Sequence, residues 1–188
     1  MMKKMSVLCG ISAGIAVAGF ATADSQSFDI ANVESWDSPG SALNHLINFD
    51  VGAGSHITGV SWDNVVGNGQ GGPSWGNEMT MGMLDEGQAY VYLQFFPSEG
   101  SSTAGGVWGP ATGGSSTNLV DAGISFYSAN GNASLEFFEA YDDGTGAVDA
   151  VYNSGTITVY WESVAPPVPG LGGMAVLAGV GLLGRRRR

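Results

Sequence analysis

The densest group of metal-ligand side chains in the chain is the acidic stretch over residues 136–149. Asp142, Asp143 and Asp149 lie there around two glycines. Carboxylate oxygens on a glycine-containing turn suit Ca²⁺, which takes about six to eight oxygen ligands. The stretch therefore makes calcium a candidate ligand of Asp142, Asp143 and Asp149, although it is not an EF-hand. A polar hairpin turn, in which Asp-Asp-Gly serves the backbone geometry, is the alternative interpretation.

Two of the five tryptophans lie in glycine-rich surroundings that favour exposure to solvent. Trp75 lies in the Gly-rich residues 71–76, and Trp108 lies in the middle of a Gly/Ser/Thr-rich stretch over residues 97–117. Because an aromatic face can stack on a sugar ring, Trp75 and Trp108 are the candidate ligand-binding residues. Core packing is the default role of tryptophan, and Trp108 folding back to cap the domain is the alternative.

The sequence offers no motif for catalysis. His45 and His56 are the only histidines, and neither has cysteine or carboxylate neighbours at metal-ligand spacing. There is no Ser-His-Asp order, nucleophile elbow or H-E-x-x-H pattern. Pairs of carboxylates for glycoside hydrolysis could be picked at will from 17 acidic residues, so they indicate nothing. We therefore expect a protein that is not an enzyme.

Charge divides the chain into an acidic body and two basic ends. All 17 Asp and Glu residues fall between Asp24 and Glu162, whereas the six Lys and Arg residues lie in residues 3–4 and 185–188. A body without a basic patch argues against nucleic-acid binding. Its like charges repel one another, and either calcium or a high salt concentration would relieve that repulsion.

The elements that must position these side chains are predicted to be strands. Gly, Ser, Thr and Asn are abundant, which favours short strands joined by turns. Alternating apolar residues predict clear strands over residues 55–63, 88–96, 133–141 and 155–162, with a bulge at Gly59. Weaker strands are expected over residues 27–33, 43–51, 77–84 and 119–127. Asn130-Gly131 predicts a hairpin, and residues 97–117 are expected to form a long loop.

About eight strands separated by turns predict an all-β fold. The body, residues 24–163, has the size of one domain. We expect a single antiparallel β-sandwich, jelly-roll-like by strand count, with an immunoglobulin-like sandwich as the alternative.

The N-terminal residues 1–23 are typical of a signal peptide. Lys3 and Lys4 precede an apolar run over residues 5–20, and Ala21 and Ala23 provide a small-x-small cleavage site. Signal peptidase would then produce a mature chain that begins at Asp24. An uncleaved anchor helix is the alternative, although the run is short for a membrane span of about 20 residues. The only cysteine, Cys9, lies in this segment.

The C-terminal residues 164–188 have three parts. A proline-rich element over residues 164–170 precedes an uncharged apolar stretch over residues 171–184, which is expected to form a transmembrane helix. Four arginines then end the chain, and they place this end on the cytoplasmic side by the positive-inside rule. The basic stop consists of Arg185, Arg186, Arg187 and Arg188.

This tripartite tail resembles the sorting tail of PEP-CTERM proteins. The resemblance implies that a membrane protease of the exosortase type cuts near the proline motif and releases or attaches the protein at the cell surface. One departure is that Pro-Val-Pro stands where the family has Pro-Glu-Pro, so a variant sorting enzyme or a plain membrane anchor is the alternative. The motif that carries the resemblance consists of Pro167, Val168, Pro169 and Gly170.

These features predict an exported protein of three parts: a signal peptide (1–23), an acidic sandwich domain (24–163) and a sorting tail (164–188). The expected role is structural or adhesive, in the cell envelope or the exopolysaccharide matrix. The alternative is a carbohydrate-binding module of the cell surface. The expected partners are signal peptidase, the exosortase-type protease, exopolysaccharide and, at least transiently, the membrane.

Overall fold

The computed structural model describes residues 22–70, 74–85, 88–99, 105–141 and 146–163, which lie in one compact unit, Ala21–Val164. Within these residues, no helix is both long enough and apolar enough to cross a membrane. The elements are β1 (Thr22–Asp29), β2 (Val33–Ser35), β3 (His45–Asp50), β4 (Ser55–Gly69), β5 (Met79–Asp85), β6 (Gln88–Gln94), β7 (Val107–Ser115), α1 (Asn118–Asp121), β8 (Phe126–Ser128), β9 (Asn132–Glu139) and β10 (Ala150–Ser163).

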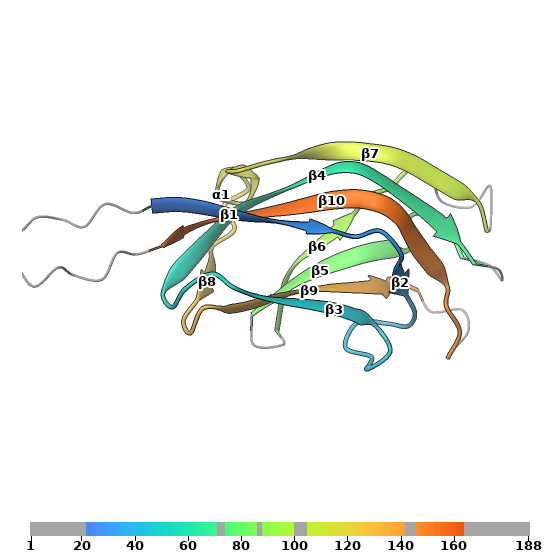
Figure 1. Cartoon of the computed structure of the whole chain (residues 1–188), viewed down its shortest axis with the longest axis horizontal. Helices are drawn as coiled ribbons and strands as arrows, with labels where there is room; N and C mark the ends of the chain where they lie inside the picture. The colour runs from blue at the N-terminus through green and yellow to red at the C-terminus, as the bar shows by residue number, and fades with distance from the viewer. Residues whose placement is uncertain (1–21, 71–73, 86–87, 100–104, 142–145, 164–188) are drawn as a thin grey trace, which may run out of the picture. The chain divides into compact units, whose positions relative to one another are not determined.

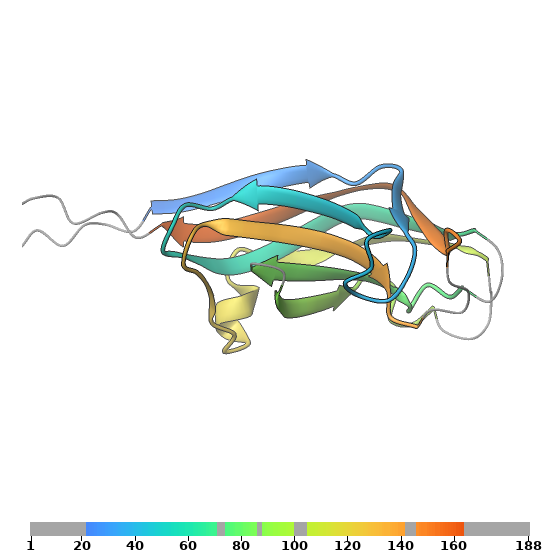
Figure 2. The same ribbon diagram turned by 90° about the horizontal axis from the view of Figure 1, so that it is seen from below.

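The strands form two antiparallel sheets (Figure 1). The six-stranded sheet has the order β1-β10-β4-β7, and the short β2 and β8 pair with β10 and β4. The four-stranded sheet has the order β3-β9-β5-β6, and these strands lie side by side in Figure 2. The prediction of an all-β, antiparallel fold is confirmed.

The eight longer strands pair as nested partners. The first pairs with the last, β1 with β10, and the second pairs with the seventh, β3 with β9. The third pairs with the sixth, β4 with β7, and the fourth pairs with the fifth, β5 with β6. Further pairings of β10 with β4 and of β9 with β5 join these pairs into the two sheets. One long antiparallel hairpin, rolled upon itself, has this connectivity.

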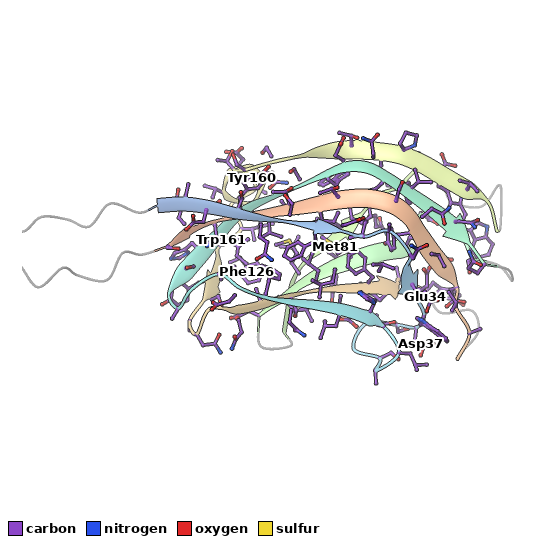
Figure 3. The ribbon with its side chains drawn as sticks, in the orientation of Figure 1. Glu34, Asp37, Met81, Phe126, Tyr160 and Trp161 are labelled. Atoms are coloured by element: carbon purple, nitrogen blue, oxygen red, sulfur yellow. The ribbon has the colours of Figure 1, made fainter. Side chains whose placement is uncertain are left out.

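The hydrophobic core lies between the two sheets, where Figure 3 shows Met81 and Trp161. Alternate residues of each strand point to opposite faces, so Met79, Met81 and Met83 of β5 are fully buried against the six-stranded sheet. Phe137 lies edge-to-face against Tyr152 of β10, with ring centroids 5.2 Å apart. Among the described residues, the core extends from Phe28 to Trp161, and we expect the body to fold by itself.

The four strands predicted most clearly from alternation are present as β4, β6, β9 and β10. The irregularity in β4 also lies close to the predicted place, because the pairing with β10 shifts between Ile57 and Gly59. Alternation succeeds here because one face of each strand is buried and the other is more exposed or polar.

The predicted loop over residues 97–117 is wrong, because it contains the strand β7. Its glycines let β7 approach β4 closely: a Cβ at Gly113 would lie 2.8 Å from the Trp62 ring. Such a strand has few side chains and therefore no alternation to detect.

Two further local predictions differ from the structure. Residues 119–127 form the helical turn α1 followed by the short β8, rather than one strand. Asn130-Gly131 does not close a hairpin, because β8 pairs with β4 whereas β9 pairs with β3 and β5. This connection instead passes from one sheet to the other.

Candidate binding cleft on the four-stranded sheet

The outer face of the four-stranded sheet carries a row of four residues, one from each strand. Leu46 of β3 lies opposite Glu136 of β9, Glu136 lies opposite Gly82 of β5, and Gly82 lies opposite Tyr92 of β6. Their chain neighbours, such as Met81, point into the core, so the alternation of the strands directs this row away from it.

One end of this row opens into a cleft of about 430 Å³, here named the outer-face cleft. Its floor is formed by strands β3, β9 and β5, and its wall is the loop over residues 36–44 that follows β2. The lining combines amides, hydroxyls, aliphatic groups and one carboxylate: Gly40, Ser41, Ala42, Asn44, Leu46, Asn48, Leu84, Asn132, Ala133, Ser134 and Glu136.

Glu136 is held in place by the loop that forms the wall. The side chain is only 5 % exposed. Its Oε1 accepts hydrogen bonds from the Gly40 backbone N–H at 2.6 Å and from Asn44 Nδ2 at 2.8 Å. Asn44 is itself fixed, because its Oδ1 accepts from the Asp37 N–H at 3.0 Å and its Nδ2 donates to Ser38 O at 2.9 Å. Within the described residues no donor reaches Glu136 Oε2, so this oxygen can serve a ligand.

The other end of the row carries an aromatic surface. Tyr92 is 56 % exposed and lies edge-to-face on the buried Phe138, with ring centroids 5.4 Å apart. Gly82 is buried beneath them and lets them pack close to β5, since a Cβ there would lie 3.3 Å from Phe138 and 3.4 Å from Tyr92. The same Cβ would lie 3.5 Å from Leu84, which lines the outer-face cleft. Leu84 therefore links the aromatic surface to the cleft.

The two tryptophans singled out from the sequence lie elsewhere. Trp108, in β7, is 3 % exposed and belongs to the core, where its ring contacts Phe96. Gly76 also packs against it, because a Cβ there would lie 2.8 Å from the indole. Trp108 thus has the packing role that was the alternative prediction. Trp75 is partly buried in the loop before β5, and its N–H donates to Glu78 Oε2 at 3.0 Å.

The acidic residues predicted to bind calcium are only partly described. Asp142 and Asp143 lie outside the described residues. Asp149 is nearly buried before β10, where its N–H donates to Ser35 O at 3.0 Å and its carbonyl accepts from Gln70 N at 2.8 Å. Within the described ranges no three or more His, Cys, Asp or Glu side chains group as metal ligands. Calcium binding stays a prediction.

If calcium binds at this acidic stretch, millimolar CaCl₂ is expected to raise Tm more than NaCl of equal ionic strength. Binding to the folded state alone adds about 2.7 kcal/mol at a concentration 100 times Kd. Thermal unfolding monitored by circular dichroism measures this difference, and Asp149→Asn is expected to reduce it. Equal shifts with the two salts would indicate screening of like charges without a specific site.

A buried polar pair that the sequence did not predict lies at the end of the core near β2. Glu139 and Tyr152 are both fully buried. Burial, and secondarily the charge of Glu139, raise the pKa of Tyr152 well above its ordinary value. The signal was present in the alternation, because Glu139 continues the inward face of Leu135 and Phe137.

The remaining predicted residues occupy separate places. His45 and His56 are exposed and lie in different sheets, against Phe137 and Tyr127 respectively. Ala23 belongs to β1 and pairs with Glu162. The predicted signal-cleavage residue Ala21, the motif Pro167, Val168, Pro169 and Gly170, and the basic stop Arg185, Arg186, Arg187 and Arg188 lie outside the described residues.

Comparison with known proteins adds no relative: no protein-family model, no curated protein and no solved structure matches the chain.

Proposed function

We propose that this chain is an exported, non-enzymatic jelly-roll protein that binds polysaccharide in the cell envelope or the exopolysaccharide matrix. The nested strand pairing supports the jelly-roll assignment, since two sheets built from one rolled hairpin are typical of that fold. Its role in the matrix is structural and adhesive.

The outer-face cleft is the observation that carries polysaccharide binding. Binding sites for small ligands are concave, with a few fixed polar groups on a largely apolar lining, and this cleft has that composition. Among the described residues that line it, Glu136 is the one carboxylate, whereas glycoside hydrolysis ordinarily takes two. The lining therefore supports binding without turnover.

Retention of the protein in native gels that contain polysaccharide tests this function. The gels should include exopolysaccharide from the source cells and a panel of soluble polysaccharides. We expect slower migration in at least one gel than in a polysaccharide-free gel, relative to a non-binding protein. Unchanged migration in every gel would overturn the proposal, and shortening of the polysaccharide would replace it with an enzymatic function.

We further propose that the chain is exported through its N-terminal signal and sorted by a PEP-CTERM-type route. The order of the proline motif, apolar stretch and arginines supports this route. The intact mass of the protein from cells and medium is expected to correspond to a chain that starts at Asp24 and ends within residues 166–170. A mass that retains Arg188 would instead indicate a plain membrane anchor.

A further inference from the structure

We propose that the outer-face cleft and Tyr92 form one binding site for a neutral glycan, which lies across the strands of the four-stranded sheet. The inference rests on the proposed polysaccharide-binding function, and it adds the ligand class and the residues of the site.

The cleft supplies the polar part of the site. Glu136 Oε2 can accept a hydrogen bond from a sugar hydroxyl without any rearrangement, because Gly40 and Asn44 already hold the carboxylate through Oε1. An acceptor that is fixed before binding loses little entropy when the ligand arrives. The amides of Asn48 and Asn132 also line the cleft, and each offers both a donor and an acceptor. Sugar hydroxyls donate and accept as well, so they match this set.

The aromatic end supplies the apolar part of the site. The exposed Tyr92 ring is braced by Phe138, and because Gly82 has no side chain the ring packs close to β5. A tyrosine ring gives a rigid contact surface with little rotamer entropy to lose, and the C–H face of a pyranose can lie on it. Neighbouring strands are about 4.8 Å apart, so the row from Leu46 to Tyr92 spans about 14 Å. An oligosaccharide segment, rather than one sugar, fits that length.

Charge selects a neutral ligand. Residues 5–184 contain no Lys or Arg, so the body offers no ammonium or guanidinium group to a uronate, sulfate or phosphate. All 17 acidic residues lie in this body, and one of them, Glu136, lines the cleft. A negatively charged polysaccharide would be repelled by both the body and the site. A neutral chain meets no such barrier.

Affinity electrophoresis of the body, residues 24–163, tests the inference. The neutral probes are laminarin, galactomannan and dextran, and the acidic probes are alginate and hyaluronan. We expect retention by a neutral probe and a weakening of at least tenfold in Tyr92→Ala and Gly82→Leu. Glu136→Gln should also weaken binding, because glutamine keeps an oxygen for Gly40 and Asn44 but replaces Oε2 with a donor. Tyr141→Ala is the matched control, since Tyr141 is 65 % exposed and lies outside the site.

The outcomes separate the inference from the function on which it rests. Retention by a neutral probe that is lost in the site variants and kept in Tyr141→Ala supports the inference. Equal retention of all variants overturns the site, and retention by acidic probes alone overturns the ligand class; in both cases the proposed function stands. No retention by any of the five probes overturns the inference, and the proposed function is overturned as well only if the gels with source exopolysaccharide also leave migration unchanged. Circular dichroism and Tm confirm folding, and Tyr92→Ala, which removes an exposed side chain, carries the test if Gly82→Leu does not fold.

Discussion

Gly114→Ala is expected to lower the free energy of unfolding by about 2–4 kcal/mol. Gly114 has a φ of +77°, a backbone conformation that costs an L-residue about 1–3 kcal/mol. A Cβ there would also overlap the Val60 carbonyl oxygen and lie 2.7 Å from Ser61 Cα and 2.9 Å from the Trp62 ring. Because two of these atoms belong to the β4 backbone, relief requires β7 to move away from β4, and overpacking of this kind costs about 1–3 kcal/mol.

Gly105→Ala separates the cost of the positive φ from the cost of overpacking. Gly105 also has a positive φ, +67°, but no atom lies within 4 Å of its added Cβ. We expect the free energy of unfolding of this variant to fall by about 1 kcal/mol, the cost of the backbone conformation alone. Urea unfolding of both variants at 25 °C measures the difference. Equal losses would contradict the close approach of β7 to β4.

Tyr152→Phe is expected to stabilise the protein by about 1–3 kcal/mol at neutral pH. The Tyr152 hydroxyl is buried, and the described residues provide no hydrogen-bond partner for it. A buried polar group in this situation costs about 1–3 kcal/mol, and phenylalanine removes the group while it keeps the ring. The ring contacts with Phe95 and Phe137 remain, so no cavity forms beyond the volume of one oxygen atom.

The same substitution should change the stability of the protein at alkaline pH. Burial raises the pKa of Tyr152 in the folded state, so the unfolded chain ionises at a lower pH than the folded one. The neutral Tyr152 therefore contributes to the free energy of unfolding. This contribution is fully present below the ordinary tyrosine pKa of about 10, and it is lost as the pH rises through the pKa of Tyr152 in the folded state. Unfolding free energies from pH 7 to 11 should therefore fall less steeply in Tyr152→Phe than in the wild type.

Tyr160→Phe is the control for both measurements. Tyr160 lies on the outer side of the six-stranded sheet, as Figure 3 shows, and its hydroxyl lies 3.0 Å from Ser61 Oγ. Removing a hydrogen-bonded, half-exposed hydroxyl is expected to cost up to about 1 kcal/mol. Destabilisation by both variants would mean that the Tyr152 hydroxyl has a favourable interaction in the native state.

Much of the fold was accessible from local alternation. The strands β4, β6, β9 and β10 each direct one mainly apolar face into the core, and this leaves an approximate period of two in the sequence. The strand β7 could not be found in this way. Its glycines and Pro110 make a poor strand by propensity, and tertiary contacts, the pairing with β4 and the packing of Trp108 in the core, stabilise it in that conformation.

The candidate site was less accessible than the fold. Of the aromatic residues, Trp108, which the sequence singled out, lies in the core, whereas Tyr92 is exposed. The local sequence around a tryptophan does not indicate whether glycines from distant segments will pack on its ring. Glu136 belonged to the recognised acidic stretch, yet its role depends on Gly40 and Asn44, which are more than 90 residues away in the sequence.

The sequence by itself determined the all-β character and the separation of an acidic body from basic ends. These properties are local, because alternation and composition are written into consecutive residues. Only the tertiary structure decided the nested pairing of the strands, the burial of Trp108 and the row that joins Glu136 to Tyr92. Each of these depends on contacts between distant segments. Which segments come into contact is determined by the packing of two sheets around one core, and not by the conformational preference of any single segment.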